Sequence, residues 1–323
     1  MNSTNSVTLT ETLREHYAKV FQDGHLVSVH VSKWGMDTNL KKEDLETNKT
    51  LPKIYKLGKK MLIAEERLNE FMSIEGKARR FLYKNSFDFP VGEAHFVPRK
   101  AIPNVLLVLD KYQTEYTKLA DMFIAKFGEY KKEMMNKYPE LKDSMYPKVE
   151  TLRDRFHFSI SMYELAMPKE LAEVDLKELI SRERAEEEVK AQLKKQLEGQ
   201  YINSMHQLEK FTEEAAKALR VQMVTLCSSL IEKINNKEII SKSKINMIRQ
   251  EIDNFKVMNF LDDKVVAGEI EKLEKVLEGR HNFRSDQEAI DSLNNALSSV
   301  VEKAQNITDI ATIRGSYFRA IKV

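Results

Sequence analysis

Histidine is the residue type in this sequence that most readily does chemistry, because imidazole binds metal ions and transfers protons near neutral pH. The seven histidines include no pair four residues apart, which is the spacing of a helical zinc site. The one set that could meet is His30 and His95, with Glu93 nearby, if the two strands that carry them pair. Polar residues on an exposed strand face are the simpler interpretation, so we expect no metal site.

The single cysteine, Cys227, is the next candidate. It lies on a predicted helix among Val224, Leu226 and Leu230, which indicates a buried, inert thiol rather than a nucleophile. The sequence contains neither a GxxxxGK[ST] phosphate loop nor a GxSxG nucleophile motif. We therefore expect a non-enzymatic protein without catalytic residues and without a cofactor.

A basic stretch is the strongest candidate for binding. Residues 49–84 contain ten Lys or Arg residues and four Glu residues, with Tyr55, Phe81 and Tyr83 between them. Such a patch could bind the phosphates of nucleic acid or an acidic protein, although a solvated helical face is the simpler alternative. The residues that we expect to contact a partner are Lys53, Lys56, Lys59, Lys60, Lys77, Arg79, Arg80 and Lys84.

The composition limits the class of protein. The 323 residues are 42% hydrophobic and 32% charged, and the net charge of +2 gives no global case for nucleic-acid binding. A single cysteine excludes an internal disulfide and fits a reducing compartment. Since we find neither a signal peptide nor an apolar run of about 18 residues, we expect a cytoplasmic protein without a membrane segment.

Proline divides the sequence into two halves, since all seven prolines lie at or before Pro168. Proline costs about 3 kcal/mol inside a helix, so the second half is well suited to long helices. We expect a mainly α-helical protein. Its predicted parts are an N-terminal tail with a short helix (1–24), a small α+β domain with a two-stranded sheet (25–168), a long helical arm (169–235) and a C-terminal helical bundle or coiled coil (236–323).

One segment of the first half has a clear strand pattern. Leu26 to Lys33 alternates apolar and polar residues, and we expect it to pair with a short strand at Ala94–Val97. Residues 1–8 are predicted to be disordered, before a short helix that ends near Phe21. Further helices are predicted at 61–83, 103–137 and 147–165, and we expect Leu119 in the second of them and Val149 in the third to face the core.

The long arm has an amphipathic stripe in which apolar residues recur in steps of three or four. The stripe is Val189, Leu193, Leu197, Tyr201, Met205, Leu208, Phe211 and Ala215, and it is not a strict heptad. Helices are predicted at 238–258, 262–279 and 286–305, with Asp262 or Asp263 and Ser285 as N-caps. Because these short helices need a surface to bury against, we expect the arm to be the spine of a second bundle.

Several segments of the first half also carry a family resemblance through their order and spacing. They are VSVHVSKWG (Val27–Gly35), KKEDL (Lys41–Leu45), LPKIYKLGKKML (Leu51–Leu62), LNEFMSIEGKARRFL (Leu68–Leu82) and FPVGEAHFVP (Phe89–Pro98). Over residues 26–165 the chain resembles an uncharacterised family of bacteriophage and mobile-element proteins. The resemblance implies a gene often found near a MoxR-type AAA+ ATPase and a von Willebrand A-like, cobaltochelatase-like protein, but it implies no activity.

Together these patterns favour a scaffold or adaptor that works through helix faces. Its expected partners are the AAA+ ATPase and the von Willebrand A-like protein, and self-association into a homo-oligomer is also open. The alternative is an accessory protein that binds nucleic acid through residues 49–84.

Overall fold

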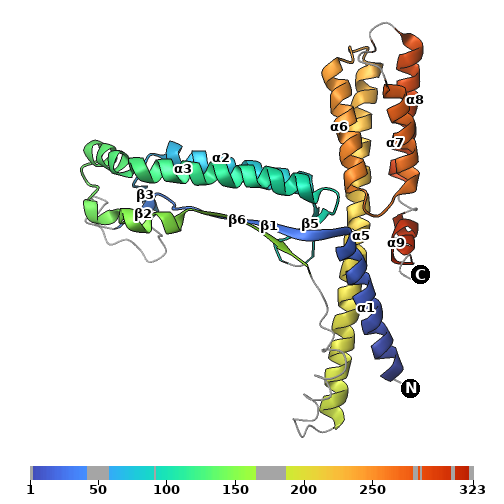
Figure 1. Ribbon diagram of the computed structural model, residues 1–323, viewed down its shortest axis with the longest axis horizontal. Coiled ribbons are helices and arrows are strands. Elements are labelled where there is room, and N and C mark those ends of the chain that lie inside the picture. Colours follow the sequence, from blue (N-terminus) through green and yellow to red (C-terminus); the bar gives the residue numbers. More distant parts are fainter. Residues whose placement is uncertain are drawn as a thin grey trace, which may run out of the picture. The chain divides into compact units, whose positions relative to one another are not determined.

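The computed structural model describes residues 3–41, 58–90, 92–164, 187–278, 283, 286–306 and 310–319. The chain is mainly α-helical, as predicted (Figure 1). It forms two compact units, each assembled from separate stretches of sequence. Unit 1 comprises Met1–Leu26, Asn85–Ile102 and Tyr163–Val323, and unit 2 comprises Val27–Lys84 and Pro103–Met162. This division differs from the four consecutive parts expected from composition.

The predicted strand at Leu26–Lys33 is confirmed as β1 (Gly24–Ser32), and β5 (His95–Pro98) lies beside it as expected. The sheet is larger than the predicted pair, however. Its order is β4-β5-β1-β6, with β4 at Phe87–Asp88 and β6 at His157–Tyr163. A separate antiparallel pair joins β2 (Asp37–Asn39) to β3 (Lys59–Met61).

The helix predicted at 147–165 was wrong, because the second half of that range forms the strand β6 and the first half forms short 3-10 turns. Short 3-10 turns at Asp143–Met145, Val149–Thr151 and Arg153–Arg155 precede the strand. Phe156 and Phe158 are both buried, which is the two-residue period of a strand. Val149, predicted to point inward, is 47% exposed. The few apolar residues of this segment fit both a helical period and a strand period. Pairing with the sheet determines that the segment forms a strand.

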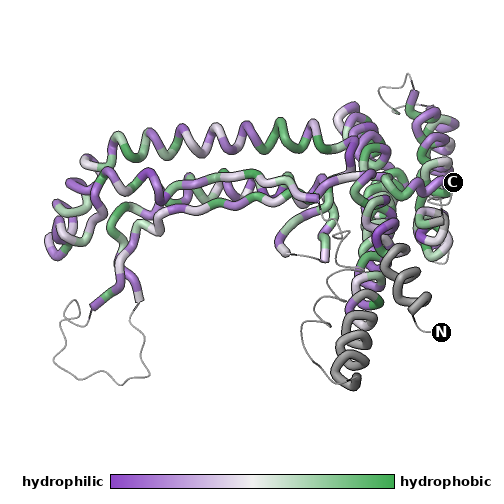
Figure 2. Tube along the Cα trace, turned by 60° about the horizontal axis from the view of Figure 1, so that its bottom comes forward, coloured by the Kyte–Doolittle hydropathy of each residue, from purple (hydrophilic) through white to green (hydrophobic). Residues whose placement is uncertain are grey.

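Two helices of unit 2 pack together beside strands β1 and β6 (Figure 1). Helix α2 (Glu65–Lys84) and helix α3 (Ile102–Lys137) lie side by side (Figure 1), close to their predicted ranges. Hydrophobic and hydrophilic residues alternate along α3 in Figure 2, as on an amphipathic helix. Phe71 of α2 packs against Tyr116 and Phe123 of α3, with ring centroids 5.3 and 5.9 Å apart. Phe156 stacks on Phe71 at 4.8 Å and closes this aromatic core.

Unit 1 is built on the long helix predicted from the second half. Helix α5 spans Glu187–Asn235 and ends at the predicted break, whereas residues 169–186 of the expected arm lie outside the described residues. Helix α1 begins at Ser3, so the prediction of disorder to residue 8 was wrong for the described residues. The helices of unit 1 are α1 (Ser3–Asp23), α5, α6 (Lys242–Met258), α7 (Lys264–Leu277), α8 (Gln287–Gln305) and α9 (Ile310–Arg319).

The expected bundle is present, since α6 and α8 pack against α5 and α7 packs against α6 and α8 (Figure 1). Asp263 caps α7 as predicted, since its carboxylate accepts from the Val266 N–H. The predicted cap at Ser285 was wrong by one residue. Asp286 caps α8 instead, by accepting from the Ala289 N–H.

The β4–β5 hairpin belongs to unit 1 because its aromatic residues pack there. Phe96 lies 5.3 Å from Phe211 of α5 and 4.8 Å from Phe260, which follows α6. Phe89 meets Phe211 at 4.9 Å. A Cβ on Gly24 would overlap the Phe96 ring and the Val97 carbonyl, so β1 can enter the sheet only with glycine there.

A buried ion pair lies at the centre of unit 1. The Arg220 side chain on α5 is 2% exposed, and its guanidinium donates to both carboxylate oxygens of Asp263, at 2.7 and 3.1 Å. Arg220 also donates to the carbonyl of Asn306, the C-cap of α8. One cation therefore joins α5 to the start of α7 and to the end of α8.

Replacing Arg220 with methionine should cost about 3–5 kcal/mol of stability, because the Asp263 carboxylate stays buried without its cation. Urea unfolding followed by circular dichroism measures this. Trp34 lies in unit 2, so its fluorescence transition should move little. The matched control is Lys256→Met, which breaks a half-exposed pair with Glu274 and should cost about 0–1 kcal/mol. Equal losses in the two variants would contradict the structural role of Arg220.

Helices α1 and α9 also meet through polar and aromatic groups. The Tyr317 hydroxyl donates to Asp23 at 2.8 Å, and the Phe318 ring stacks on His16 at 4.2 Å. Among the described residues, the buried Nδ1 of His16 has no hydrogen-bond partner. Burial lowers the pKa of His16, and the opposing charges of Glu209 and Glu15 only partly compensate.

This contact predicts a pH-dependent stability. Because the folded pKa of His16 lies below its ordinary value of 6.5, the unfolded chain binds a proton first as the pH falls. Stability should therefore decrease from about pH 6.5 downward, and His16→Gln should remove that part of the decrease. Urea unfolding of both proteins at pH 7.5 and pH 5.5 is the measurement. Parallel losses in the two proteins would contradict the assignment to His16.

Candidate partner-binding groove

The predicted basic residues do not form one surface. Lys53 and Lys56 lie outside the described residues. Lys59, on β3, forms an ion pair with Asp37 at 3.0 Å. Lys60 is half-buried on the same strand. Lys59 and Lys60 thus lie on a different element from the cations of α2.

Arg79 is held in a small charge network. Glu75 accepts from Arg79 at 3.1 Å and from Lys33 at 2.6 Å. Burial by itself would raise the pKa of Glu75, but the hydrogen bonds and charges of Lys33 and Arg79 outweigh it and lower the pKa. Arg79 is therefore paired with Glu75, and it lies on a different side of α2 from the remaining cations.

The remaining cations share one face of α2. Lys77, Arg80 and Lys84 follow each other at steps of three and four residues, which places them on one side of a helix. All three are exposed. Toward the helix start the same face continues with Glu70 and Glu66. The structure thus converts part of a basic sequence into a face that is acidic at one end and basic at the other.

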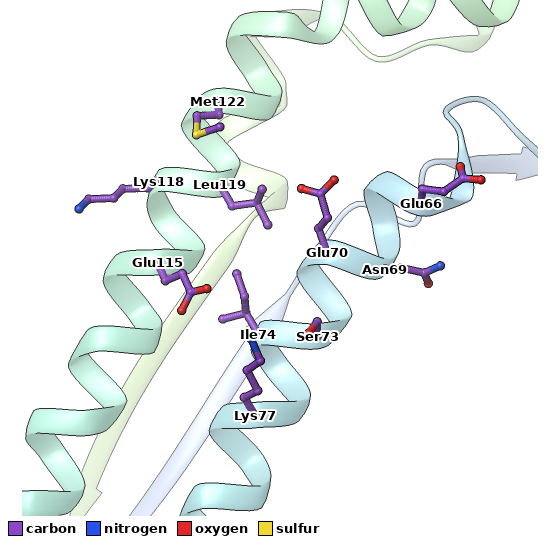
Figure 3. A pocket seen from close by; sticks show the side chains of 10 residues that line it. All are labelled: Glu66, Asn69, Glu70, Ser73, Ile74, Lys77, Glu115, Lys118, Leu119 and Met122. Carbon is purple, nitrogen blue, oxygen red and sulfur yellow. The ribbon is translucent and has the colours of Figure 1, made fainter.

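This face borders a groove between α2 and α3 (Figure 3), with a volume of about 670 Å³. Ile74 of α2 and Leu119 of α3 face each other across it. Met122 adds to the apolar surface and is 59% exposed, which is high for a large apolar side chain. Ile74 itself is 5% exposed and Leu119 is half-buried, so the solvent-exposed apolar surface of the groove comes mainly from Met122.

Charged side chains border the groove on both helices. Glu66, Glu70 and Lys77 come from α2, and Glu115 and Lys118 come from α3. Glu70 and Glu115 point into the groove in Figure 3, whereas Lys118 extends from the outer side of α3. Glu70 pairs with Arg67 at 3.1 Å. The charged groups thus surround an apolar strip and could fix the orientation of a bound segment.

The groove rests on the aromatic core of unit 2. Phe71, Tyr116 and Phe123 are each no more than 3% exposed and lie one position along from the groove residues. The Tyr116 hydroxyl donates to the Ser32 carbonyl at 2.7 Å, and burial raises the pKa of Tyr116. These contacts hold α2 and α3 on the sheet, so the groove has rigid walls.

A second, smaller hollow lies at the start of α2, with a volume of about 370 Å³. It shares Glu66 with the groove and adds Met134, Tyr138 and Leu141 from the end of α3 and beyond. Tyr138 is 39% exposed there. The apolar surface of unit 2 therefore extends past the acidic end of the groove.

Other candidate chemistry receives little support. His95 Nδ1 lies 3.0 Å from Asp88, and the His30 ring lies 6.5 Å from that of His157. Within the described ranges, no group of three or more His, Cys, Asp or Glu residues is arranged to hold a metal ion. Cys227 is buried on α5, and burial raises the pKa of its thiol to about 12, as expected for an inert cysteine. None of the helices in the described part is long and apolar enough to cross a lipid bilayer.

Comparison with known protein families identifies the family of the chain. A family model described as "Protein of unknown function (DUF3150)" matches residues 22–282. The chain belongs to this family. The predicted resemblance to an uncharacterised family is confirmed in this form, and the match extends well beyond residues 26–165 into α7. No curated protein and no solved structure matches the chain.

Sequence reasoning missed the groove because it treated the apolar residues of α3 as a single buried face. Leu119 was expected to be buried, but it is only half-buried and lines the groove, while Ala120 and Phe123 face the core. The sequence contains one signal for the groove, because Met122 lies three residues after Leu119 and beside the core-facing stripe of α3. An apolar residue just outside a core stripe widens the apolar face beyond what the core needs.

The groove surface and its support should respond differently to substitution. Phe123→Ala should destabilise unit 2 by about 3–5 kcal/mol, because it removes a buried ring from the aromatic core. Met122→Lys should change stability by no more than about 0.5 kcal/mol, because that side chain is largely in solvent. Urea unfolding followed by Trp34 fluorescence compares the two. A large loss for Met122→Lys would show that Met122 belongs to the core.

Proposed function

We propose that the chain is a non-enzymatic adaptor that binds a helical segment of a partner protein in the groove between α2 and α3. The observation that carries the proposal is the groove between the two helices, in which exposed Met122 and half-buried Leu119 lie beside buried Ile74 and are bordered by charged residues. A helix laid between two others buries one apolar stripe and keeps its polar face in solvent.

The partner that we propose belongs to a AAA+ system of a phage or mobile element, in the cytoplasm of the host cell. This part of the proposal is supported by the resemblance described above, which implies neighbouring genes for a MoxR-type ATPase and a von Willebrand A-like protein. An adaptor would link such an ATPase to its substrate or to the von Willebrand A-like protein through helix contacts.

Nucleic-acid binding is a second candidate, supported by the exposed face of Lys77, Arg80 and Lys84. Three cations in a row can follow a phosphate backbone. Glu66 and Glu70 continue the same face, however, and would repel phosphates at its other end. The groove therefore favours a protein partner over nucleic acid.

Co-purification tests the proposed function. The full chain, co-expressed with the neighbouring AAA+ ATPase and von Willebrand A-like protein, should retain at least one of them on an affinity column. Met122→Lys should reduce the retained amount by about tenfold, since it places a charge among the apolar residues of the groove. The matched control is Met72→Lys, which changes a 50% exposed methionine of α2 that does not line the groove.

Two outcomes would contradict the proposal. One is the absence of both proteins from the eluate. The other is equal retention by Met122→Lys and the unchanged chain. A salt-dependent gel shift that is lost in Lys77→Gln, Arg80→Gln and Lys84→Gln together would instead favour nucleic acid.

A further inference from the structure

The α2 wall of the groove has a charge gradient that defines a direction. Glu66 and Glu70 lie on its first turns, and Lys77, Arg80 and Lys84 lie on the same face farther along. Glu66 lies eleven residues before Lys77, which is about 16 Å of helix. The acidic and basic ends are thus about three helical turns apart, with Ile74 between them.

The charged residues that line the groove have few ion-pair partners on the described part of the protein. Within the described part of the chain, no ion pair joins Glu66, Glu115, Lys77 or Lys118 to another residue, and Glu70 alone has a partner, in Arg67. The five charged groups that line the groove therefore face solvent in the absence of a ligand. A ligand with charges in the reverse order would meet favourable partners at both ends of the α2 face, whereas α3 has Glu115 toward the Lys77 end and Lys118 toward the Glu70 end (Figure 3).

From this arrangement we infer that the occupant is an amphipathic helix of at least three turns that runs antiparallel to α2. Its apolar stripe covers Ile74, Leu119 and Met122. Its cationic end lies over Glu66 and Glu70, and its anionic end lies over Lys77, Arg80 and Lys84. The inference rests on the proposed function, because it specifies the segment that the adaptor binds.

The direction follows from the helix dipole. A helix is more stable with carboxylates in its first turn and cations in its last turn. A helical ligand charged in this way places its N-terminus over the cations of α2 and its C-terminus over Glu66 and Glu70. Since α2 begins at the Glu66 end, the ligand runs opposite to α2. The second hollow, which contains Tyr138, lies beyond that C-terminus and can receive one further apolar residue.

Synthetic peptides test the inference directly. A labelled peptide of about 18 residues is long enough to form helix in solution, with Leu at steps of three and four, Glu in its first turns and Lys in its last. A second peptide has the same composition with Glu and Lys exchanged. Fluorescence anisotropy with the full chain should show the first binding about tenfold more tightly than the second, and both weakening in high salt.

Variants of the chain supply the matched controls. Met122→Lys should weaken both peptides by about tenfold or more, whereas Met72→Lys should leave them unchanged. Glu66→Lys with Glu70→Lys, combined with Lys77→Glu and Arg80→Glu, should reverse the preference between the two peptides. These four residues are exposed, so the fold should tolerate the exchange, and circular dichroism checks this.

Equal affinities for the two peptides, or no binding of either, would overturn the inference. Dimerisation of the chain that Met122→Lys abolishes would also overturn it, since the occupant would then be a second copy. The same experiments distinguish failure of this inference from failure of the proposed function. If the ATPase is retained through Met122 but neither peptide binds, the adaptor role stands and the ligand class is wrong. If the peptides bind in the expected order but no ATPase is retained, the groove is correct and the partner is wrong.

Discussion

The buried guanidinium of Arg220 is the interaction on which the organisation of unit 1 depends. A charge with 2% exposure is stable only with full hydrogen bonding, and Asp263 and the Asn306 carbonyl provide it. Asp263 accepts these bonds while its carboxylate also caps α7. The N–H of Asp263 donates in turn to the side-chain oxygen of Asn259 at 2.9 Å. The polar group thus specifies which helix ends meet on α5. Apolar packing alone would specify this less strictly, since Leu and Ile side chains fit many registers.

Unit 2 is held together by a different kind of contact. Its rings form a cluster in which Phe71 touches residues of α3 and of the segment before β6. Aromatic rings are large and rigid, so they fix the distance between α2 and α3 as well as their attachment to the sheet. That spacing leaves buried Ile74 and half-buried Leu119 facing each other across the groove (Figure 3). The open groove is therefore a consequence of how the core beneath it packs.

The sequence predicted the elements whose signal is local. The helices of α3, α6, α7 and α8 follow from long amphipathic stripes and from the Asp263 cap, and β1 follows from strict alternation. What depends on distant residues was missed. The segment before Tyr163 has too few apolar residues to separate a helix from a strand, and its pairing in the sheet settles the matter. The hairpin of Phe89 and Phe96 belongs to unit 1 only because Phe211 and Phe260, more than a hundred residues away, complete its aromatic cluster. Arg220 gave no sign in the sequence that it would be buried.

The arrangement of charges at the candidate site was also missed from the sequence. Counting residues 49–84 gave a basic patch, but a count ignores direction around a helix. On α2, Arg79 turns toward Glu75, while Lys77 and Arg80 share a face with Glu66 and Glu70. The net charge of that face is small, yet its two ends differ in sign. A dipolar face cannot attract a uniformly charged polymer along its whole length, but it can orient a ligand that is itself dipolar. An α-helix is the commonest segment with that property, since its backbone dipole favours carboxylates at its start and cations at its end. The α2 face of the groove thus matches the intrinsic polarity of a helix that runs antiparallel to it.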